Sequence, residues 1–369
     1  MILDIDKTFC SGCEACVQRC PNKSVVAHVD EHGFAYPYVI TDMCIECHLC
    51  EKVCPINNQR DTRVPLSTYA AINIKDEIRL KSSSGGVFTA IAELVIQNGG
   101  VVFGARFNEN GEVIHDYTEV KEGLDDFRRS KYVQSQIRDN FIKVEMFLKQ
   151  GRQVMFTGTP CHIAGLKSFL RKDYDNLLLI DVACHGVPSQ FVWKSYISKR
   201  EVSSVNFRDK KTGWKKYSIS INDYTSLYYK DMYMLCFLSN LSLRPSCFNC
   251  QFKSGSSGSD LTLGDFWGVD KYDSQLDDDL GTSLVLSFSR KGENLLRKTD
   301  LKIIDVDYKM VCSNNSALVY SAVKPKEYDI FWHDFSKSGI KAINKWGKRN
   351  GPSKLIMIKK FIHRLIYKN

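Results

Sequence analysis

The sequence predicts a small α+β unit followed by a larger mixed α/β domain. Cysteine repeats occupy residues 1–60, and segments with the patterns of strands and helices alternate after them. A chain of 369 residues is too long for one small cysteine-rich unit, so we expect two or three structural units. With 43% hydrophobic and 11% aromatic residues, the chain can form a substantial core.

Eight of the fourteen cysteines form one motif that occurs twice. Both copies read C-x2-C-x2-C-x3-C-P, and their cysteines are Cys10, Cys13, Cys16 and Cys20, then Cys44, Cys47, Cys50 and Cys54. This is the bacterial ferredoxin signature, in which the fourth cysteine of each run binds the other of two [4Fe–4S] clusters. The expected ligand sets are Cys10, Cys13 and Cys16 with Cys54, and Cys44, Cys47 and Cys50 with Cys20. We therefore predict an α+β ferredoxin-like N-terminal domain over residues 1–60.

Zinc and disulfide bonds explain these eight cysteines less well. Structural zinc sites favour two C-x2-C pairs, so a third close cysteine in each run would be surplus. Disulfides between residues this close would be strained. Met1–Asp6 carries acidic residues where a signal peptide would carry lysine or arginine, and no apolar run reaches the length of a membrane span. These features predict a cytoplasmic protein in a reducing compartment.

The positive charge of the chain is concentrated at its C-terminal end. The net charge is +9, and residues 337–369 contain ten Lys or Arg and no acid, which leaves −1 for residues 1–336. Apolar residues follow helical spacing at Ile358, Phe361, Ile362, Leu365 and Ile366. This basic amphipathic tail fits peripheral contact with an anionic membrane or an acidic partner, or a helix packed on its own domain. No nucleic-acid-binding fold is recognisable.

The middle of the chain has α/β organisation. Residues 57–67 are polar, contain Pro65, and are interpreted as a linker. The pattern predicts strands at Ser24–Val29, Phe34–Ile40, Thr68–Ile74, Gly100–Phe107, Gln153–Phe156 and Leu177–Val182, and helices at Val87–Gln97 and Ile163–Leu170. Alternation between Val205 and Tyr233 favours further β-structure.

Four later cysteines form a second candidate site. Cys161 and Cys184 each follow a predicted buried strand, where open α/β sheets bind ligands, and Cys247 and Cys250 form a C-x2-C pair. Together they fit a third [4Fe–4S] cluster, whereas the C-x2-C pair alone fits zinc equally well. Cys161, at a helix N-terminus, also fits a redox-active thiol of low pKa. Cys236 and Cys312 match no pattern and are predicted to be buried in the core.

Two further features have both a functional and a structural interpretation. The serine- and glycine-rich segment at residues 82–86 precedes a helix, which fits a phosphate cradle or an ordinary helix start. No G-x-G-x-x-G occurs, so a Rossmann NAD site has no support. His162 and His185 follow cysteines and fit proton relays or structural residues.

Six ordered segments resemble the coenzyme F-420 (deazaflavin) hydrogenase/dehydrogenase beta-subunit family. They are Ser83–Thr89, Ser130–Ser135, Thr157–Cys161, Cys184–Pro188, Arg244–Cys250 and Ser259–Gly268. The likeness extends over about residues 68–330 and implies a mixed α/β flavin-binding domain with FAD and a [4Fe–4S] cluster on Cys161, Cys184, Cys247 and Cys250. It also implies flavin contacts at Ser84, Gly85, Gly86, Lys131, Tyr132, Gln134, Ser135, Thr157, Gly158, Thr159 and Pro160.

The resemblance implies an oxidoreductase that takes electrons from ferredoxin or another low-potential donor. Electrons would pass through the clusters to FAD and leave as hydride to a deazaflavin-like or other small two-electron substrate. Lys131, His162 and His185 are the candidate catalytic residues; Lys131 would place positive charge near the flavin. The family commonly has glutamine where this chain has His162. The alternatives are an electron-transfer adaptor that feeds a partner enzyme, for example in surface-polysaccharide synthesis, and a zinc-stabilised binding module.

Overall fold

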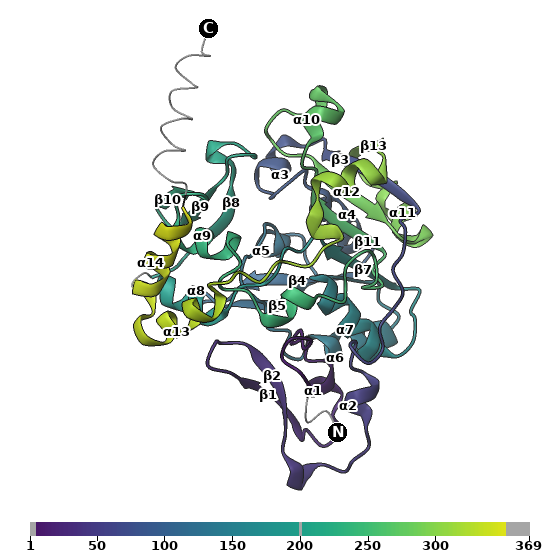
Figure 1. Cartoon of the computed structure of the whole chain (residues 1–369). Helices are drawn as coiled ribbons and strands as arrows, with labels where there is room; N and C mark the ends of the chain where they lie inside the picture. The colour runs from purple at the N-terminus through teal and green to yellow at the C-terminus, as the bar shows by residue number, and fades with distance from the viewer. Residues whose placement is uncertain (1–4, 199–200, 352–369) are drawn as a thin grey trace.

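The computed structural model describes residues 5–198 and 201–351. The N-terminal unit lies at one end of the molecule, below the large domain in the view of Figure 1. It consists of an antiparallel hairpin, β1 (Val25–Val29) and β2 (Ala35–Val39), and two short helices, α1 (Ala15–Arg19) and α2 (Leu49–Lys52). Each cysteine run contains one of these helices, so each sequence repeat forms one half of the unit. The predicted α+β class of the N-terminal unit is confirmed in its described residues.

The large domain is built on one mixed sheet of eight strands, in the order β13-β3-β12-β11-β7-β6-β4-β5. The four central strands, β11, β7, β6 and β4, are parallel, and the flanking strands join them in antiparallel pairs. Their bounds are β3 (Ser67–Asn73), β4 (Val101–Phe107), β5 (Val113–Thr118), β6 (Val154–Gly158), β7 (Leu177–Val182), β11 (Leu261–Asp265), β12 (Ser283–Ser287) and β13 (Leu301–Asp305). The predicted mixed α/β class is confirmed.

Helices cover both faces of this sheet, because side chains of buried central strands alternate between two cores. Met155 and Leu178 pack against α4 (Val87–Gln97) on one face, whereas Phe156 and Leu179 pack against α6 (Asn140–Lys149) and α7 (Pro160–Leu170) on the other. The remaining helices of the sheet domain are α3 (Asp76–Leu80), α5 (Leu124–Phe127), α10 (Val269–Tyr272), α11 (Arg290–Leu296) and α12 (Tyr308–Asn314).

A second, three-stranded sheet lies to the side of the large one, in the order β10-β9-β8. Its strands are β8 (Val205–Asp209), β9 (Ser218–Ile221) and β10 (Tyr224–Leu227), and its neighbours are α8 (Gln190–Ile197), α9 (Met232–Leu238), α13 (Tyr328–Ser338) and α14 (Ile340–Asn350). Ile343 and Trp346 of α14 are buried in the same core as α9. Part of the basic C-terminal segment is thus packed on the large domain. The amphipathic pattern at residues 358–366 lies outside the described residues.

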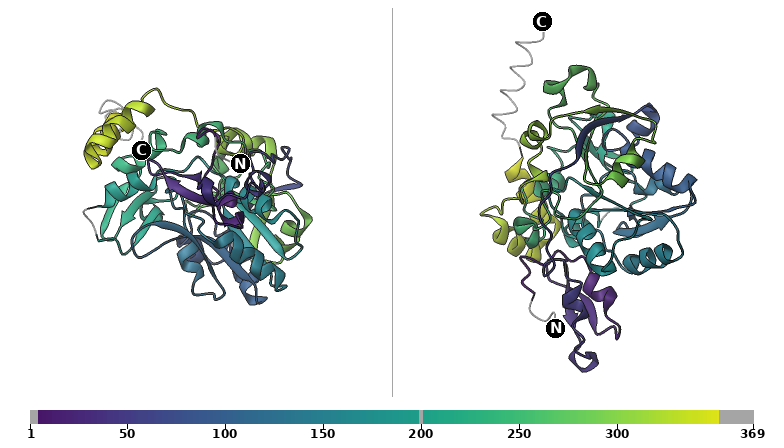
Figure 2. Two further views of the ribbon diagram at one scale, coloured as in Figure 1. Left: turned by 90° about the horizontal axis from the view of Figure 1, so that it is seen from below. Right: turned by 90° about the vertical axis from the view of Figure 1, so that its right-hand side faces the viewer.

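The N-terminal unit shares its hydrophobic core with the large domain. Buried cysteines and valines of the unit pack with side chains of α6 and α7, and Figure 2 shows the unit directly against these helices. The Arg19 guanidinium lies over the Phe169 ring at 3.8 Å and forms an ion pair with Glu145 at 3.2 Å. The Gln18 side-chain oxygen accepts a hydrogen bond from the Phe141 amide at 2.9 Å. The unit is therefore fixed on the domain rather than tethered by the linker alone.

Candidate metal centres and electron path

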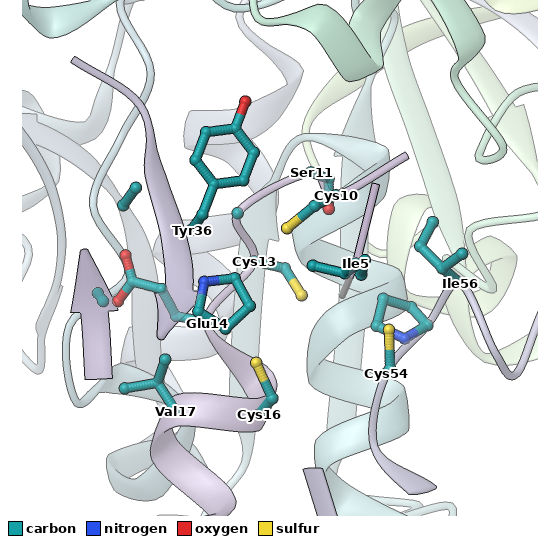
Figure 3. A pocket seen from close by; sticks show the side chains of 15 residues that line it. Ile5, Cys10, Ser11, Cys13, Glu14, Cys16, Val17, Tyr36, Cys54 and Ile56 are labelled. Carbon is teal, nitrogen blue, oxygen red and sulfur yellow. The ribbon is translucent and has the colours of Figure 1, made fainter. Parts of the chain in front are cut away.

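Four cysteines of the N-terminal unit line one cavity. They are Cys10, Cys13, Cys16 and Cys54, the first of the two expected ligand sets. All four are buried, and Figure 3 shows their sulfur atoms around the same space. Burial raises the pKa of the Cys13 and Cys16 thiols well above its ordinary value, and neighbouring cysteines raise it further. Four free thiols at one enclosed site fit a [4Fe–4S] cluster, because bound iron would replace their protons.

The second expected set has a more exposed setting. Cys50 is buried, Cys20 and Cys44 are half-buried, and Cys47 is exposed. The Cys20 thiol lies 3.1 Å from the Ser24 hydroxyl, and Cys20 and Cys44 both pack at the edge of the core that contains Cys50. The second set is therefore the more exposed of the two expected ligand sets.

A second cavity is lined by Cys161, Cys184, Cys247 and Cys250. Cys161 lies in the first turn of α7, directly after β6, and Cys184 lies two residues after β7. Because β6 and β7 are adjacent and parallel, their carboxyl ends bring these two cysteines to the same edge of the sheet. We call this the Cys161 cavity, and the cavity of Figure 3 the Cys10 cavity.

Backbone pairing brings the C-x2-C pair to the Cys161 cavity. A β-bridge joins Pro188 to Leu243, and the Arg244 amide donates to the Val187 carbonyl at 3.0 Å. A 3-10 helix over Pro245–Asn249 then turns Cys247 toward the segment after β7, so that the Val187 amide lies 3.4 Å from the Cys247 sulfur. The four thiols thus come from three segments of the chain that the fold places together.

Two cationic side chains line the Cys161 cavity. Burial raises the pKa of Cys161, Cys184 and Cys247 to about 12, and the proximity of other thiols adds to this rise. Arg244 and Lys253 line the same cavity and act in the opposite direction. Four convergent thiols with two cations nearby fit an anionic metal–thiolate centre. The donor set is all sulfur, which suits a [4Fe–4S] cluster and also a tetrahedral zinc ion.

The two cavities are neighbours. Ser11 lines both of them, and Phe9 of the N-terminal unit lines the Cys161 cavity. Helix α7 connects them on one face, because Gly165 follows Cys161 by four residues. A Cβ atom on Gly165 would lie 2.8 Å from the Cys13 Cβ and 2.9 Å from its sulfur. Only a glycine at this position lets α7 approach the N-terminal unit so closely.

The residues expected to contact a flavin separate into two groups. Ser83 accepts hydrogen bonds from the Ser130 amide and hydroxyl at 2.8 and 3.1 Å, so two of the sequence segments meet here. Ser84 and Gly85 bond to the backbone and side chain at the start of β12, and Gly86 adopts a left-handed conformation before α4. Since β3 runs in the same direction as β6 and β7, this loop lies at the same sheet edge as the Cys161 cavity.

Lys131 and Tyr132 have different contacts from Gln134 and Ser135. The Lys131 amine donates to the carbonyls of Asp126 and Arg128 at 2.7 and 2.6 Å, and Tyr132 stacks on Phe237. Gln134 instead contacts the N-terminal unit by donating to the Ser11 carbonyl at 3.2 Å. The Ser135 hydroxyl lies 2.7 Å from Nδ1 of His115. Gln134 and Ser135 are thus placed at the junction of the two units rather than beside the loop at residues 83–86.

The residues at the end of β6 lie between this junction and the Cys161 cavity. The Thr157 hydroxyl donates to the Phe103 carbonyl at 2.9 Å, and a Cβ on Gly158 would lie 3.1 Å from the Cβ of His162. The Thr159 hydroxyl lies 3.1 Å from the Cys161 sulfur, and Pro160 lines the Cys161 cavity. These four residues therefore shape the start of α7.

The two candidate histidines have different environments. His185 lines the Cys161 cavity, is exposed, and its Nε2 lies 2.6 Å from the Asn240 side-chain oxygen. His162 is buried behind the cavity, packed at a right angle against His115 with ring centres 5.0 Å apart. Burial lowers the pKa of His162 well below its ordinary value, so His162 is neutral at physiological pH. Its placement favours a structural role, whereas that of His185 leaves a proton-relay role open.

Several residues at the site had no role assigned from the sequence. Arg244 and Ser11 lie between the cavities, Lys210 donates to the Ser84 carbonyl at 2.8 Å, and His115 holds Ser135 and the Thr157 carbonyl. Arg244 was visible in a sequence motif, but nothing local indicated what it contacts. Of the two unassigned cysteines, Cys236 is buried as expected. Cys312 is only half-buried, beside Tyr308, which corrects that prediction.

Comparison with known proteins agrees with this geometry. Residues 151–307 match the family described as the C terminus of the beta subunit of coenzyme F420 hydrogenase/dehydrogenase, and residues 9–58 match the 4Fe-4S dicluster domain. The chain combines these two domains. It is thus an iron–sulfur electron-transfer protein whose residues 151–307 are similar to the beta subunits of F420 hydrogenases and dehydrogenases.

One solved structure shows a distant likeness to this chain. A chain in the structure of the xenon-derivatized F420-reducing [NiFe] hydrogenase complex from Methanosarcina barkeri is 16% identical, with a TM-score of 0.49, covering 77% of this chain and 91% of that chain. A likeness at this level carries no argument about function. No curated protein matches the sequence. Within residues 5–198 and 201–351, no helix has the length and apolar character of a membrane span.

Proposed function

We propose that this beta-subunit relative is an iron–sulfur flavoprotein oxidoreductase. Its N-terminal clusters receive single electrons from ferredoxin or another low-potential donor, and a third cluster on Cys161, Cys184, Cys247 and Cys250 relays them to FAD. FAD supplies hydride transfer, which one-electron clusters do not, to a deazaflavin-like or other small two-electron substrate. The observation that carries this proposal is the Cys161 cavity, lined by four thiols and sharing Ser11 with the Cys10 cavity.

The exposure of the cysteines supports a direction for the path. Cys47 is exposed, and the apolar side chains of Met43 and Ile45 beside it are 47% and 58% exposed. An exposed ligand with an apolar rim suits a transient contact with a donor protein. The Cys10 set is buried further inside, and the Cys161 set lies beyond it in the large domain. Electrons entering at Cys47 would therefore move from the most exposed set toward the sheet edge.

The loop at residues 83–86 suits an anionic cofactor such as FAD. Two half-buried lysines flank this loop, Lys131 through Ser130 and Lys210 through the Ser84 carbonyl. Both donate only to carbonyl oxygens in the described part of the chain, and neither has a carboxylate within ion-pair distance there. Burial lowers the pKa of each to about 7. Cations left without a carboxylate partner beside a helix N-terminus favour a bound phosphate or anionic ring.

The decisive measurement is the content of iron, acid-labile sulfide and flavin in protein purified without oxygen. The full proposal predicts about twelve irons and one FAD per chain, the count for three [4Fe–4S] clusters. Cys161→Ala should lower iron by about four per chain, whereas Cys236→Ala, at a buried cysteine outside both cavities, should leave iron unchanged. About twelve irons without flavin would contradict the hydride chemistry and favour an adaptor that feeds a partner enzyme. Zinc in place of iron at the Cys161 cavity would contradict the relay.

A further inference from the structure

Arg244 is a fully buried cation between the two cavities. Its guanidinium donates to the Cys10 carbonyl and the Ala35 carbonyl, both at 2.8 Å, and to the Gln134 side-chain oxygen at 3.1 Å. Its side chain has 0% exposure. Every one of these acceptors is neutral, and in the described part of the chain Arg244 forms no ion pair with a carboxylate. A buried charge without an ion-pair partner is strongly unfavourable. The buried Glu14 carboxyl group interacts with Arg244 electrostatically but lies beyond ion-pair distance, so further negative charge beside the guanidinium would stabilise it.

The surroundings of Arg244 point to both thiol sets as the source of that negative charge. Its Nη2 lies 3.9 Å from the Cys10 sulfur, and its side chain lines the Cys161 cavity. Among the residues that line either cavity, Arg244 is the one arginine. It therefore contacts one thiol of the first expected ligand set, that of Cys10, and lines the cavity of the other four thiols.

The N-terminal unit is shaped to admit this side chain. Gly12, between Cys10 and Cys13, has φ +66°, and a Cβ there would lie 2.7 Å from Arg244 Nη1. On the other side the guanidinium lies over the Tyr36 ring at 4.2 Å. Arg244 is thus held by a turn that only glycine fits, by an aromatic face, and by three hydrogen bonds. These contacts within the protein fix the position of the Arg244 side chain without a bound cluster.

We infer that Arg244 is the shared counter-charge of the two clusters, which sets their reduction potentials together. This rests on the proposed function, because it requires clusters in both cavities. Each thiolate-bound cluster becomes more negative on reduction, so a fixed positive charge at the sulfur atoms favours the reduced state and raises the potential. A single cation between the clusters acts on both. Arg244 would therefore favour reduction of the two clusters at this junction over reduction of the cluster at the solvent-exposed Cys47.

The test is a redox titration of the clusters, followed by electron paramagnetic resonance, on intact protein and two variants. Arg244→Gln should shift two of the cluster potentials to more negative values at unchanged iron content, and Arg244→Lys, which keeps the charge, should shift them less. Arg79→Gln is the matched control, since Arg79 is a buried arginine paired with Asp278 away from both cavities. Unshifted potentials in Arg244→Gln with full iron content would overturn the inference.

A second measurement needs no variant. In wild-type protein with 15N-labelled arginine, the signal of the reduced clusters should carry a 15N hyperfine coupling, because the guanidinium touches the Cys10 sulfur. Absence of this coupling would overturn the inference even if Arg244→Gln fails to fold. A wild-type count of about eight irons would instead contradict the third cluster of the proposed function. The Cys10 cluster would in that case still report whether Arg244 sets its potential.

Discussion

Gly165 of α7 faces Cys13 of the N-terminal unit so closely that a methyl group would lie 2.9 Å from the Cys13 sulfur. The same helix presents Cys161 one turn earlier to the neighbouring cavity. One helix face therefore fixes the separation of the two thiol sets. The junction between the units therefore lies on the electron path that we propose.

Gly165→Ala should weaken this junction. The added methyl overlaps both the Cβ and the sulfur of Cys13, and overpacking of this kind costs about 1 to 3 kcal/mol of stability. We expect a lower urea midpoint and loss of about four irons per chain, the Cys10 cluster. Gly351→Ala is the control, because its methyl would meet Leu235 at an ordinary 3.4 Å. Equal iron content and equal urea midpoints in both variants would show that α7 can move away from Cys13 without loss of stability or of the cluster.

Cys47→Ala should slow the entry of electrons from a protein donor without preventing chemical reduction of the other clusters. Because Cys47 is the exposed member of its set, its loss removes the cluster nearest to solvent, about four irons per chain. Reduction of the remaining clusters by a protein donor should slow, whereas reduction by dithionite should still reach them. Cys312→Ala, at a half-buried cysteine outside both expected N-terminal sets, serves as control. Unchanged donor rates in Cys47→Ala would place the entry point elsewhere.

Lys131→Ala should lower the flavin potential or the flavin content. Burial lowers the pKa of Lys131 to about 7, so its positive charge increases as the pH falls through 7. The difference in flavin potential between wild type and Lys131→Ala should accordingly grow from pH 8 to pH 6, because a cation favours the anionic reduced flavin. Lys298→Ala, at an exposed lysine, should behave as wild type. Identical potentials and flavin content across this range would exclude Lys131 from the flavin site.

Asp181 should make stability pH-dependent. It is 2% exposed, and burial raises its pKa to about 6, although the Ser257 and Thr262 hydroxyls donate to it. The folded state therefore retains this proton at pH values where the unfolded state has lost it. The stabilisation is complete below the unfolded pKa and is lost as the pH rises through 6. Between pH 5 and 7 the free energy of unfolding should fall by about 1 to 2 kcal/mol on this account.

Urea unfolding of wild type and Asp181→Asn at pH 5, 6 and 7 measures this effect. The variant lacks the titrating carboxyl, so its stability should depend less on pH by that amount. Parallel curves for the two proteins would show that Asp181 stays ionised in the folded protein.

Local patterns predicted the elements that carry the site. The helix at Val87–Gln97 and the strand at Leu177–Val182 coincide with α4 and β7, because apolar periodicity and flanking glycine or polar residues define their limits. Helix α7 begins three residues before the predicted Ile163, since Pro160 occupies its first turn, where proline is well tolerated. The convergence of Cys161 and Cys184 followed from the rule for adjacent parallel strands.

The sequence patterns did not predict the contacts between segments that are distant in the chain. Arg244 reaches Cys10 across the interface of the two units, and Gly165 matters only because Cys13 lies opposite. In the stretch at residues 131–135 the spacing gave no indication that Gln134 contacts Ser11 of the N-terminal unit. A coil segment has no fixed period, so its side-chain directions are set by tertiary packing alone.

The lining of the Cys161 cavity has a consequence for biogenesis. Phe9 and Ser11 are synthesised at the start of the chain, whereas Cys247 and Cys250 emerge from the ribosome long after them. The wall of this cavity is therefore completed only when the earliest and the late segments meet. If the proposed third cluster forms on these late cysteines, iron and sulfide would have to reach them before or during that closure, and cluster assembly would be coupled to docking of the N-terminal unit.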